Sequence, residues 1–299
     1  MTDAALATAP AAIALASRAR WKLTRGDIAT YALNIIIAAA FLLPWVLAIT
    51  ISLLPDLALK TYPPTIFAWP PDFSSYRDLL TIDDGRFVGY LRTSAVVAGC
   101  TAISVVLVSG MAGYALSKLR FAGRELFFVA ILGTLMFPFT TVLIPLFSIM
   151  SQLRLVNNPV SLIILYTVVQ APFCTFLFRN SFGAVPDAVR ESALVDGANE
   201  WSVLFRVMIP LALPALATVL IYSFYNSWNE FTIALIFLTD DNTTTVPIGL
   251  VNLTTSGRYA SHPNMQMAGA VMSFLPILIL FLLFQRFFVS GIISGSTKG

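Results

Sequence analysis

Five polar or aromatic residues stand close together in an otherwise apolar stretch, and their types suit the binding of a hydroxyl-rich ligand. They are Tyr222, Tyr225, Asn226, Asn229 and Glu230. The first four fall at positions i, i+3, i+4 and i+7, so a helix would present them on one face. Aromatic rings can stack on a sugar ring, and amides can exchange hydrogen bonds with its hydroxyls. The alternative is that these groups join neighbouring helices, and the pattern leaves both interpretations open.

Other chemistries find no support in the sequence. His262 is the only histidine, so no second histidine can complete a zinc site. The chain contains no HExxH or GxSxG motif and no GxxxxGK[ST] phosphate loop. Cys100 and Cys174 lie inside apolar stretches, where thiols behave as small hydrophobes. We therefore expect no catalytic residue, no metal site and no cofactor bound by this chain.

The composition is that of an integral membrane protein. Of the 299 residues, 58% are apolar and only 11% are charged, whereas about 25% are charged in a typical soluble domain. A net charge of +3 is too small and too dispersed to indicate nucleic acid as a partner.

Six apolar segments are long enough to cross a bilayer, which takes about 20 helical residues. We therefore predict an all-α fold with six transmembrane helices, at 28–54, 93–116, 126–150, 160–178, 211–238 and 267–288.

The segments between and beside these spans complete the predicted organisation. Residues 1–27 form an N-terminal tail, and 289–299 form a C-terminal tail. The stretch 55–92 is polar and rich in proline, so we expect an extracytoplasmic loop that is too broken for a helix. Residues 93–288 form the transmembrane core, and this core includes a long polar loop at 182–210.

Lysines and arginines are distributed unevenly between the two sides. With six spans both termini share one side, and that side holds 12 of the 18 basic residues. The other side holds six, which are Lys60, Arg77, Arg86, Arg92, Arg154 and Arg258. Because cytoplasmic loops carry the excess of positive charge, we predict that both termini and the loop 182–210 are cytoplasmic.

The polar loop carries the signals of two short helices joined by a turn. Pro186 and Asp187 suit a helix start, because proline tolerates the first turn and an acid favours the positive end of the helix dipole. Gly197 can adopt the left-handed conformation that ends a helix, and Asn199 can cap the next one.

The first of these helices suits the docking of a partner protein. Ser192 and Ala193 are small enough to let a partner approach the backbone closely, and Glu191 offers a carboxylate at the rim. Asp196 and Gly197 form the turn that follows. The alternative is an ordinary amphipathic helix that lies on the membrane face.

The spacing of these residues also resembles a known motif. Glu191, Ser192, Ala193, Gly197, Ile209 and Pro210 are similar to the EAA loop of ABC importer permeases, in which the segment docks on ATPase subunits. Ser192 stands where that family usually has alanine. Trp228-Asn229-Glu230-Phe231 and a C-terminal pattern from Gln285-Arg286 to Lys298-Gly299 narrow the resemblance to the carbohydrate-importing, maltose permease-like branch.

The resemblance implies a type I importer permease fold and a set of partners. These are a second and usually different permease subunit, two cytoplasmic ATPase subunits that bind ATP and Mg, and an extracytoplasmic binding protein that delivers the sugar. The expected location is the cytoplasmic membrane of a bacterium or archaeon. The alternative function is an ion-coupled secondary transporter, which would need intramembrane ion sites on paired broken helices. Against it, Glu230 is the one acid in a span interior, and no inverted repeat is evident.

Overall fold

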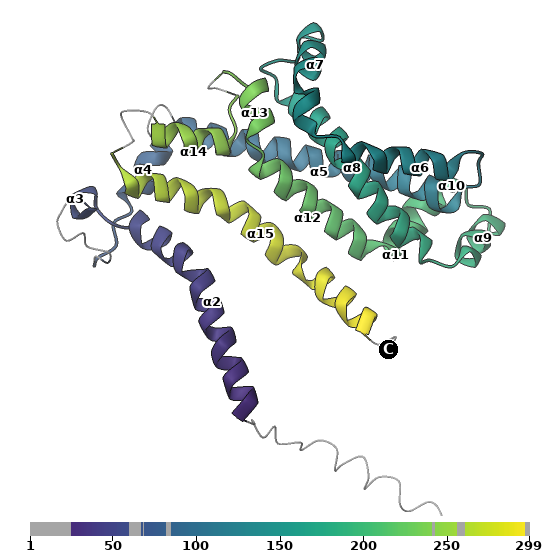
Figure 1. Cartoon of the computed structure of the whole chain (residues 1–299), viewed down its shortest axis with the longest axis horizontal. Coiled ribbons are helices and arrows are strands. Elements are labelled where there is room, and N and C mark those ends of the chain that lie inside the picture. The colour runs from purple at the N-terminus through teal and green to yellow at the C-terminus, as the bar shows by residue number, and fades with distance from the viewer. Residues whose placement is uncertain are drawn as a thin grey trace, which may run out of the picture. The chain divides into compact units, whose positions relative to one another are not determined.

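Every regular element in the described part of the chain is a helix. The computed structural model describes residues 25–59, 67, 69–81, 85–240, 243–255 and 261–296 (Figure 1). The chain divides into two units, residues 1–47 and residues 48–299. In the first unit the described residues form most of helix α2 (Arg25–Ser52), which contains Pro44. The predicted N-terminal tail lies outside the described residues except for its last three positions.

The apolar helices of the described residues confirm a membrane protein of up to six spans. Four helices are each long and apolar enough to cross a bilayer, and two bent pairs of shorter helices bring the number to six if each pair is one span. The four are α2, α5 (Arg86–Lys118), α8 (Pro159–Gly183) and α15 (Pro263–Ser296).

The predicted third span is bent. It consists of α6 (Arg124–Gly133), a 3₁₀ turn η2 (Thr134–Met136) and α7 (Phe139–Gln152), with an angle of 99° between its two parts. Pro138 explains the bend, because a proline disfavours helical backbone in the residue before it and has no N–H to donate. Phe137 accordingly has an extended conformation, with φ −86° and ψ 126°.

The predicted fifth span, 211–238, is also interrupted. Helix α12 (Leu213–Asn229) ends before Glu230, and a separate short helix, α13 (Thr232–Phe237), follows. At its other end α12 is bent by 85° from the helical segment Glu200–Leu211. The segment 211–238 therefore contains two helices, and the polar residues near 230 mark the break between them.

Helices also occupy segments that we expected to be loops. The stretch 55–92 contains α3 (Asp56–Leu59), α4 (Ser74–Thr81) and the first turns of α5. Its prolines at 70 and 71 precede α4 instead of interrupting it, and α4 buries Leu79. Between the predicted spans 211–238 and 267–288 lies α14 (Val246–Thr255), and α15 continues to Ser296 into the predicted C-terminal tail.

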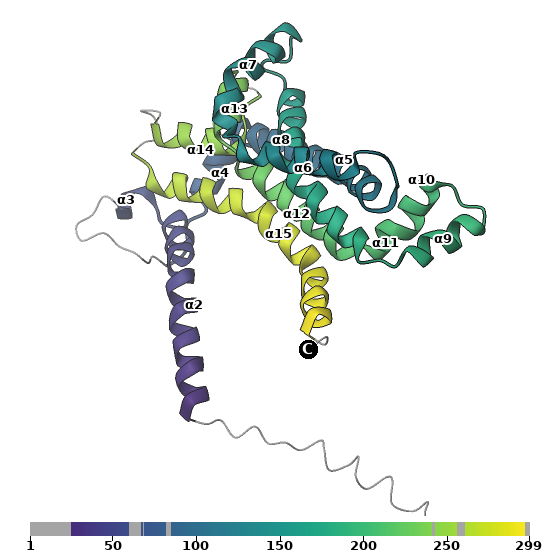
Figure 2. The same ribbon diagram turned by 45° about the vertical axis from the view of Figure 1, so that its right-hand side comes forward.

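Helices α5 and α8 form the centre of the second unit. Gly113 of α5 allows this close packing, since a Cβ there would lie only 2.6 Å from the Cβ of Phe178 and 2.9 Å from the amide nitrogen of Arg179. One apolar cluster, around Val105, Phe178 and Met208, joins these helices to the polar loop. Helices α7 and α13 lie side by side (Figure 2), and the ring centres of Phe147 and Phe237 are 5.7 Å apart.

Candidate docking and translocation sites

The polar loop has the predicted helix–turn–helix geometry. Helix α9 (Asp187–Val195) ends at a turn in which Gly197 has φ 86°. The amide of Gly197 donates to the carbonyl of Leu194, and the amide of Ala198 donates to that of Ala193. These two bonds satisfy carbonyls at the end of α9 and define a Schellman turn. Asn199 then caps α10 (Glu200–Val203) by accepting from the Ser202 amide at 2.8 Å.

Most of the predicted docking residues are exposed. Glu191, Ser192, Asp196 and Gly197 are accessible, whereas Ala193 is half-buried against the apolar cluster. Among the described residues no group pairs with the Glu191 carboxylate, and the neighbouring Val195 side chain is 88% exposed. The loop therefore presents one anionic and partly apolar face, which is the arrangement that a docking surface needs.

The start of α9 is held by a buried lysine that sequence analysis did not single out. Lys118, at the end of α5, donates to the Val185 carbonyl at 2.6 Å and to the Asp187 carboxylate at 2.5 Å. Its side chain is only 4% exposed, whereas that of Asp187 is 69% exposed. The hydrogen bond from Lys118 lowers the pKa of the Asp187 carboxyl below its ordinary value. The Asp187 carboxyl is therefore ionised at neutral pH.

The start of α10 is held by a second residue of α5. The hydroxyl of Tyr114, which is buried, donates to the Glu200 carboxylate. Arg190 of α9 pairs with the same carboxylate and donates from Nε to the Tyr114 oxygen at 3.3 Å. The only sequence signal for this network was a pair of polar residues, Tyr114 and Lys118, one helical turn apart at the end of an apolar span.

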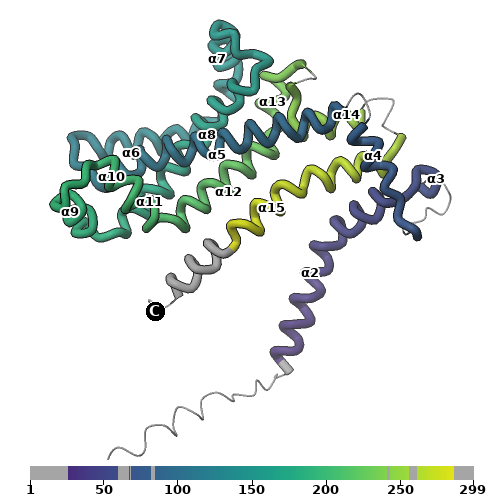
Figure 3. Tube along the Cα trace, turned by 180° about the vertical axis from the view of Figure 1, so that it is seen from behind, coloured from purple at the N-terminus to yellow at the C-terminus, as the bar shows by residue number. Residues whose placement is uncertain are grey.

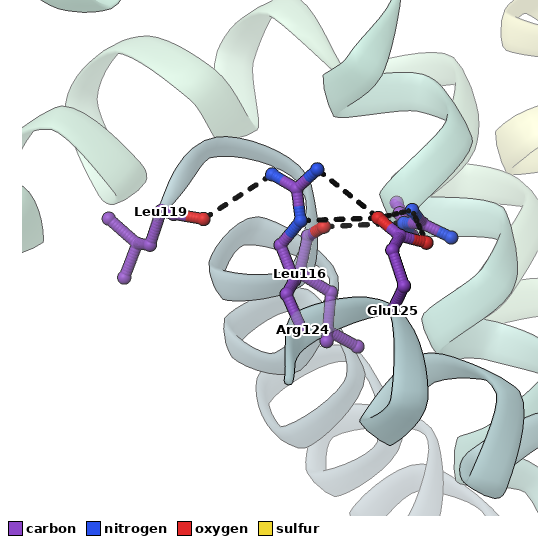
Figure 4. A network of polar contacts seen from close by, with 5 residues as sticks. Leu116, Leu119, Arg124 and Glu125 are labelled. Atoms are coloured by element: carbon purple, nitrogen blue, oxygen red, sulfur yellow. Dashed lines mark hydrogen bonds and ion pairs between the residues drawn. The ribbon is translucent and has the colours of Figure 1, made fainter. Parts of the chain in front are cut away.

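A second polar network lies at the junction of α5, α6 and α8, and Figure 4 shows the part of it around Arg124 and Glu125. Arg179 donates to both oxygens of Glu125 at 2.7 Å and to the Leu116 carbonyl at 3.2 Å. Its guanidinium carbon also lies 3.7 Å from the centre of the Phe128 ring. Arg124 reaches the same carboxylate at 3.2 Å. These contacts fix the start of α6 on α8 beside the docking loop.

Only some of the residues that we predicted for a ligand-binding face of α12 are exposed. Tyr225 is 51% exposed and Asn229 is also exposed, so these two remain available to a ligand. Tyr222 is half-buried, with its ring 4.9 Å from that of Phe173. The amides of Asn226 and Asn229 donate to carbonyls one turn earlier in α12, each at 2.8 Å.

Glu230 is occupied by protein contacts instead of facing outward with Tyr225. Its carboxylate accepts from the Tyr166 hydroxyl of α8 at 2.7 Å. It also accepts from the amides of Ile233 and Ala234, at 2.8 and 3.0 Å, and so caps the start of α13. Because a helix start leaves its first amides without intrahelical partners, this carboxylate stabilises the break between α12 and α13.

Further polar pairs continue from Glu230 along the contact between α8 and α12. Gln170 donates to Ser227 at 3.0 Å, and the sulfur of Cys174 lies 3.8 Å from the Ser223 hydroxyl. These pairs stand about one turn apart on each helix. They show that polar residues of α12 outside the predicted set, Ser223 and Ser227, join this helix to α8.

One large hollow lies apart from the residues predicted to bind a ligand. It has a volume of about 890 Å³ and is lined mostly by apolar residues of α5, α6, α7, α8 and the bend of the third span, among them Val108, Phe137 and Pro172. None of the five predicted ligand-binding residues lines it. Nδ1 of His262 lies 3.0 Å from an Asp56 oxygen, and no group of three metal-ligating side chains gathers among the described residues.

Comparison with known proteins places these observations in a family. The sequence model of the "Binding-protein-dependent transport system inner membrane component" matches residues 105–294. The arabinooligosaccharides transport system permease protein AraQ of Halalkalibacterium halodurans is 36% identical over 215 residues, which cover 72% of this chain and 76% of the relative. The trehalose/maltose transport system permease protein MalG of Thermococcus litoralis is 31% identical over 266 residues, which cover 89% and 94%.

The fold is similar to that of a solved transporter as well. A chain of a bacterial ABC transporter involved in the import of the acidic polysaccharide alginate superposes with a TM-score of 0.78 at 26% identity, and the match covers 89% of this chain and 98% of that one. The shared type I permease fold, the helical spans and the matched sequence agree. The chain belongs to the family of inner membrane components of binding-protein-dependent transport systems.

Proposed function

We propose that this chain is the permease subunit of an ATP-driven importer that moves a sugar or oligosaccharide across the cytoplasmic membrane of a bacterium or archaeon. The observation that carries the proposal is the exposed α9–α10 loop, with its free Glu191 carboxylate, on a chain of this transport family. The names of the relatives AraQ and MalG, which state oligosaccharide and trehalose/maltose transport, support a sugar as the substrate.

We propose that partner subunits hydrolyse the ATP that drives transport. The sequence has no GxxxxGK[ST] loop, so ATP and Mg would be bound by two cytoplasmic ATPases. These ATPases would dock on Glu191, Ser192, Ala193, Asp196 and Gly197. Shifting the ratio of two conformations of the permease from about 1:99 to 99:1 needs roughly 5.5 kcal/mol of differential binding. Closure of the ATPases on ATP can supply this free energy.

One docking loop in one chain implies a second permease subunit, so that each ATPase has its own loop. We propose a heterodimer of permeases, with an extracytoplasmic binding protein that delivers the sugar to it. The dependence on a binding protein is the defining property of the family. The excess of basic residues on the side of the docking loop supports a cytoplasmic location for that loop and for both termini.

The exposed face of α12 is the proposed contact with the sugar. Tyr225 can stack on a sugar ring, and Asn229 retains an amide oxygen that can accept from a hydroxyl. Tyr222 and Asn226 are less accessible and would support this face from within. Glu230 would fix the end of α12, and so set the position of Asn229, without touching the sugar.

The test is purification of the intact complex with its ATPases, followed by a screen of sugars with the binding protein present. We expect one class of sugar to stimulate ATP hydrolysis. In cells, uptake should be abolished when the partner ATPase is inactivated and should persist in the presence of proton uncouplers. Uptake that stops with uncouplers and persists without the ATPase would instead indicate an ion-coupled secondary transporter.

A further inference from the structure

Two residues on one face of α5 hold both helices of the docking loop. Lys118 binds the start of α9 through the Val185 carbonyl and the Asp187 carboxylate. Tyr114, four residues earlier and therefore on the same face, binds the Glu200 carboxylate at the start of α10. Each helix of the loop is thus fixed at its first turn to the end of a transmembrane helix.

We propose that Tyr114 and Lys118 are positioning residues that couple the docking loop to α5, so that movement of the loop is carried into the transmembrane core. This inference rests on the proposed function, because it assumes that ATPases dock on the exposed face of the loop. It adds the route by which their movement enters the permease.

The contacts at this junction are of the kind that resists separation. Hydrogen bonds that involve a charged partner are about twice as strong as neutral ones. The Lys118 side chain is almost fully buried, so separation from its partners would leave a charge without compensation in a poorly solvated place. Arg190 bridges the two loop helices by pairing with Glu200 and Tyr114, and it makes α9 and α10 follow the same displacement.

Helix α5 is built to carry such a displacement across the membrane. Its 33 residues span about 50 Å. Gly113 keeps its inner part in close contact with α8. At its other end the Ser94 hydroxyl accepts from the Val246 amide at 2.8 Å, and the Tyr90 ring packs directly on Gly249 of α14. Figures 1 and 3 show α5 running from α14 at one end to α10 at the other.

A purely structural role for Tyr114 and Lys118 makes a different prediction. If these residues only fold the loop, their loss should lower the yield or thermal stability of the complex, while each assembled complex still moves the same amount of sugar per ATP. If they couple the loop to α5, the complex should assemble, because the exposed face with Glu191 and Val195 is unchanged. ATP hydrolysis should then continue while the amount of sugar moved per ATP falls.

The experiment uses the complete complex in proteoliposomes, with the binding protein and the sugar found in the screen. Tyr114→Phe and Lys118→Met each remove one contact to the loop. Arg92→Met is the matched control, because Arg92 is an exposed cation on the same helix with no hydrogen-bond partner among the described residues. Complex yield, ATP hydrolysis and sugar moved per ATP are measured for each variant.

We expect near-normal assembly and ATP hydrolysis, with sugar moved per ATP reduced roughly fivefold or more in Lys118→Met, the lower end of usual coupling factors. The control should match the wild type. Exchanging the charges in Arg190→Glu/Glu200→Arg should restore coupling relative to Glu200→Arg alone.

Three results would count against the proposals, and they are distinguishable. Wild-type sugar transport per ATP in both Tyr114→Phe and Lys118→Met would overturn the coupling role. Reduced yield or stability with unchanged transport per ATP would assign these residues to folding alone and also overturn it. A wild-type complex in which no sugar stimulates hydrolysis would refute the proposed function itself, before any variant is compared.

Discussion

Replacing Gly113 with alanine tests the close packing of α5 on α8. A Cβ at this position would lie 2.6 Å from the Phe178 Cβ and 2.9 Å from the Arg179 amide nitrogen. The first distance is roughly 1 Å short of the ~3.5 Å at which carbon atoms pack best. Neither neighbour is the end of a flexible side chain, so the helices themselves must separate. Gly99, on the same helix, has no heavy atom within 4 Å of the corresponding position and provides a matched control.

Only Gly99→Ala should stabilise the protein. Alanine in place of glycine inside a helix gains about 0.5–1 kcal/mol from helix propensity alone. Gly99→Ala should keep that gain. In Gly113→Ala the overpacking should cost about 1–3 kcal/mol, which cancels or outweighs it. The variants should therefore differ by about 1–3 kcal/mol in the free energy of unfolding.

The assay is thermal unfolding of the purified chain in detergent. Unfolding is measured as the loss of the monodisperse peak in size-exclusion chromatography. If each kcal/mol shifts Tm by about 2–4 °C in a chain of this size, Gly113→Ala should melt several degrees below Gly99→Ala. Gly110→Ala should melt close to Gly99→Ala, because its Cβ would meet only a Phe178 ring carbon at an ordinary 4.0 Å. Equal melting temperatures for all three variants would refute the packing of α5 and α8 described above.

Three further predictions concern the docking loop, the ligand face and the orientation. Gly197→Val should impair ATPase association and transport but not membrane insertion, because valine resists a φ of 86°; normal uptake would contradict it. Tyr225→Ala and Asn229→Ala should lower sugar transport and spare basal ATP hydrolysis, whereas reduced complex yield with unchanged transport per complex would assign the face to packing. In a cysteine-free background, Ser74→Cys should react with an impermeant reagent in intact cells and Asp196→Cys only after permeabilisation, and the reverse would overturn the predicted orientation.

The transmembrane organisation could be predicted from the sequence because it depends on long apolar segments and local turn signals. Pro186, Gly197 and Asn199 determine the docking loop through rules that act within a few residues, and the structure has those turns where the residues indicate them. The bend at Pro138 follows from the same kind of local rule, although a hydropathy window alone treats the segment as one span.

The contacts between distant segments could not be predicted in this way. Lys118 meets Asp187 across 69 positions, and Tyr114 meets Glu200 across 86. Which partner each finds depends on how α5 packs against the loop, and no local pattern encodes that. Glu230 illustrates the same limit, because its residue type suits a ligand site and a helix cap equally well. Only the position of Tyr166 and the start of α13 decide between the two.

The cap formed by Glu230 also bears on how the chain enters the membrane during synthesis. A carboxylate and a broken helix would both be costly in lipid without partners. The amides of Ile233 and Ala234 are made immediately after Glu230, and its other partner, Tyr166, lies 64 residues earlier. All three partners therefore belong to this chain, and the Tyr166 hydroxyl is synthesised before the carboxylate. The fifth span can thus settle into the bilayer on contacts from its own chain, ahead of assembly with any other subunit.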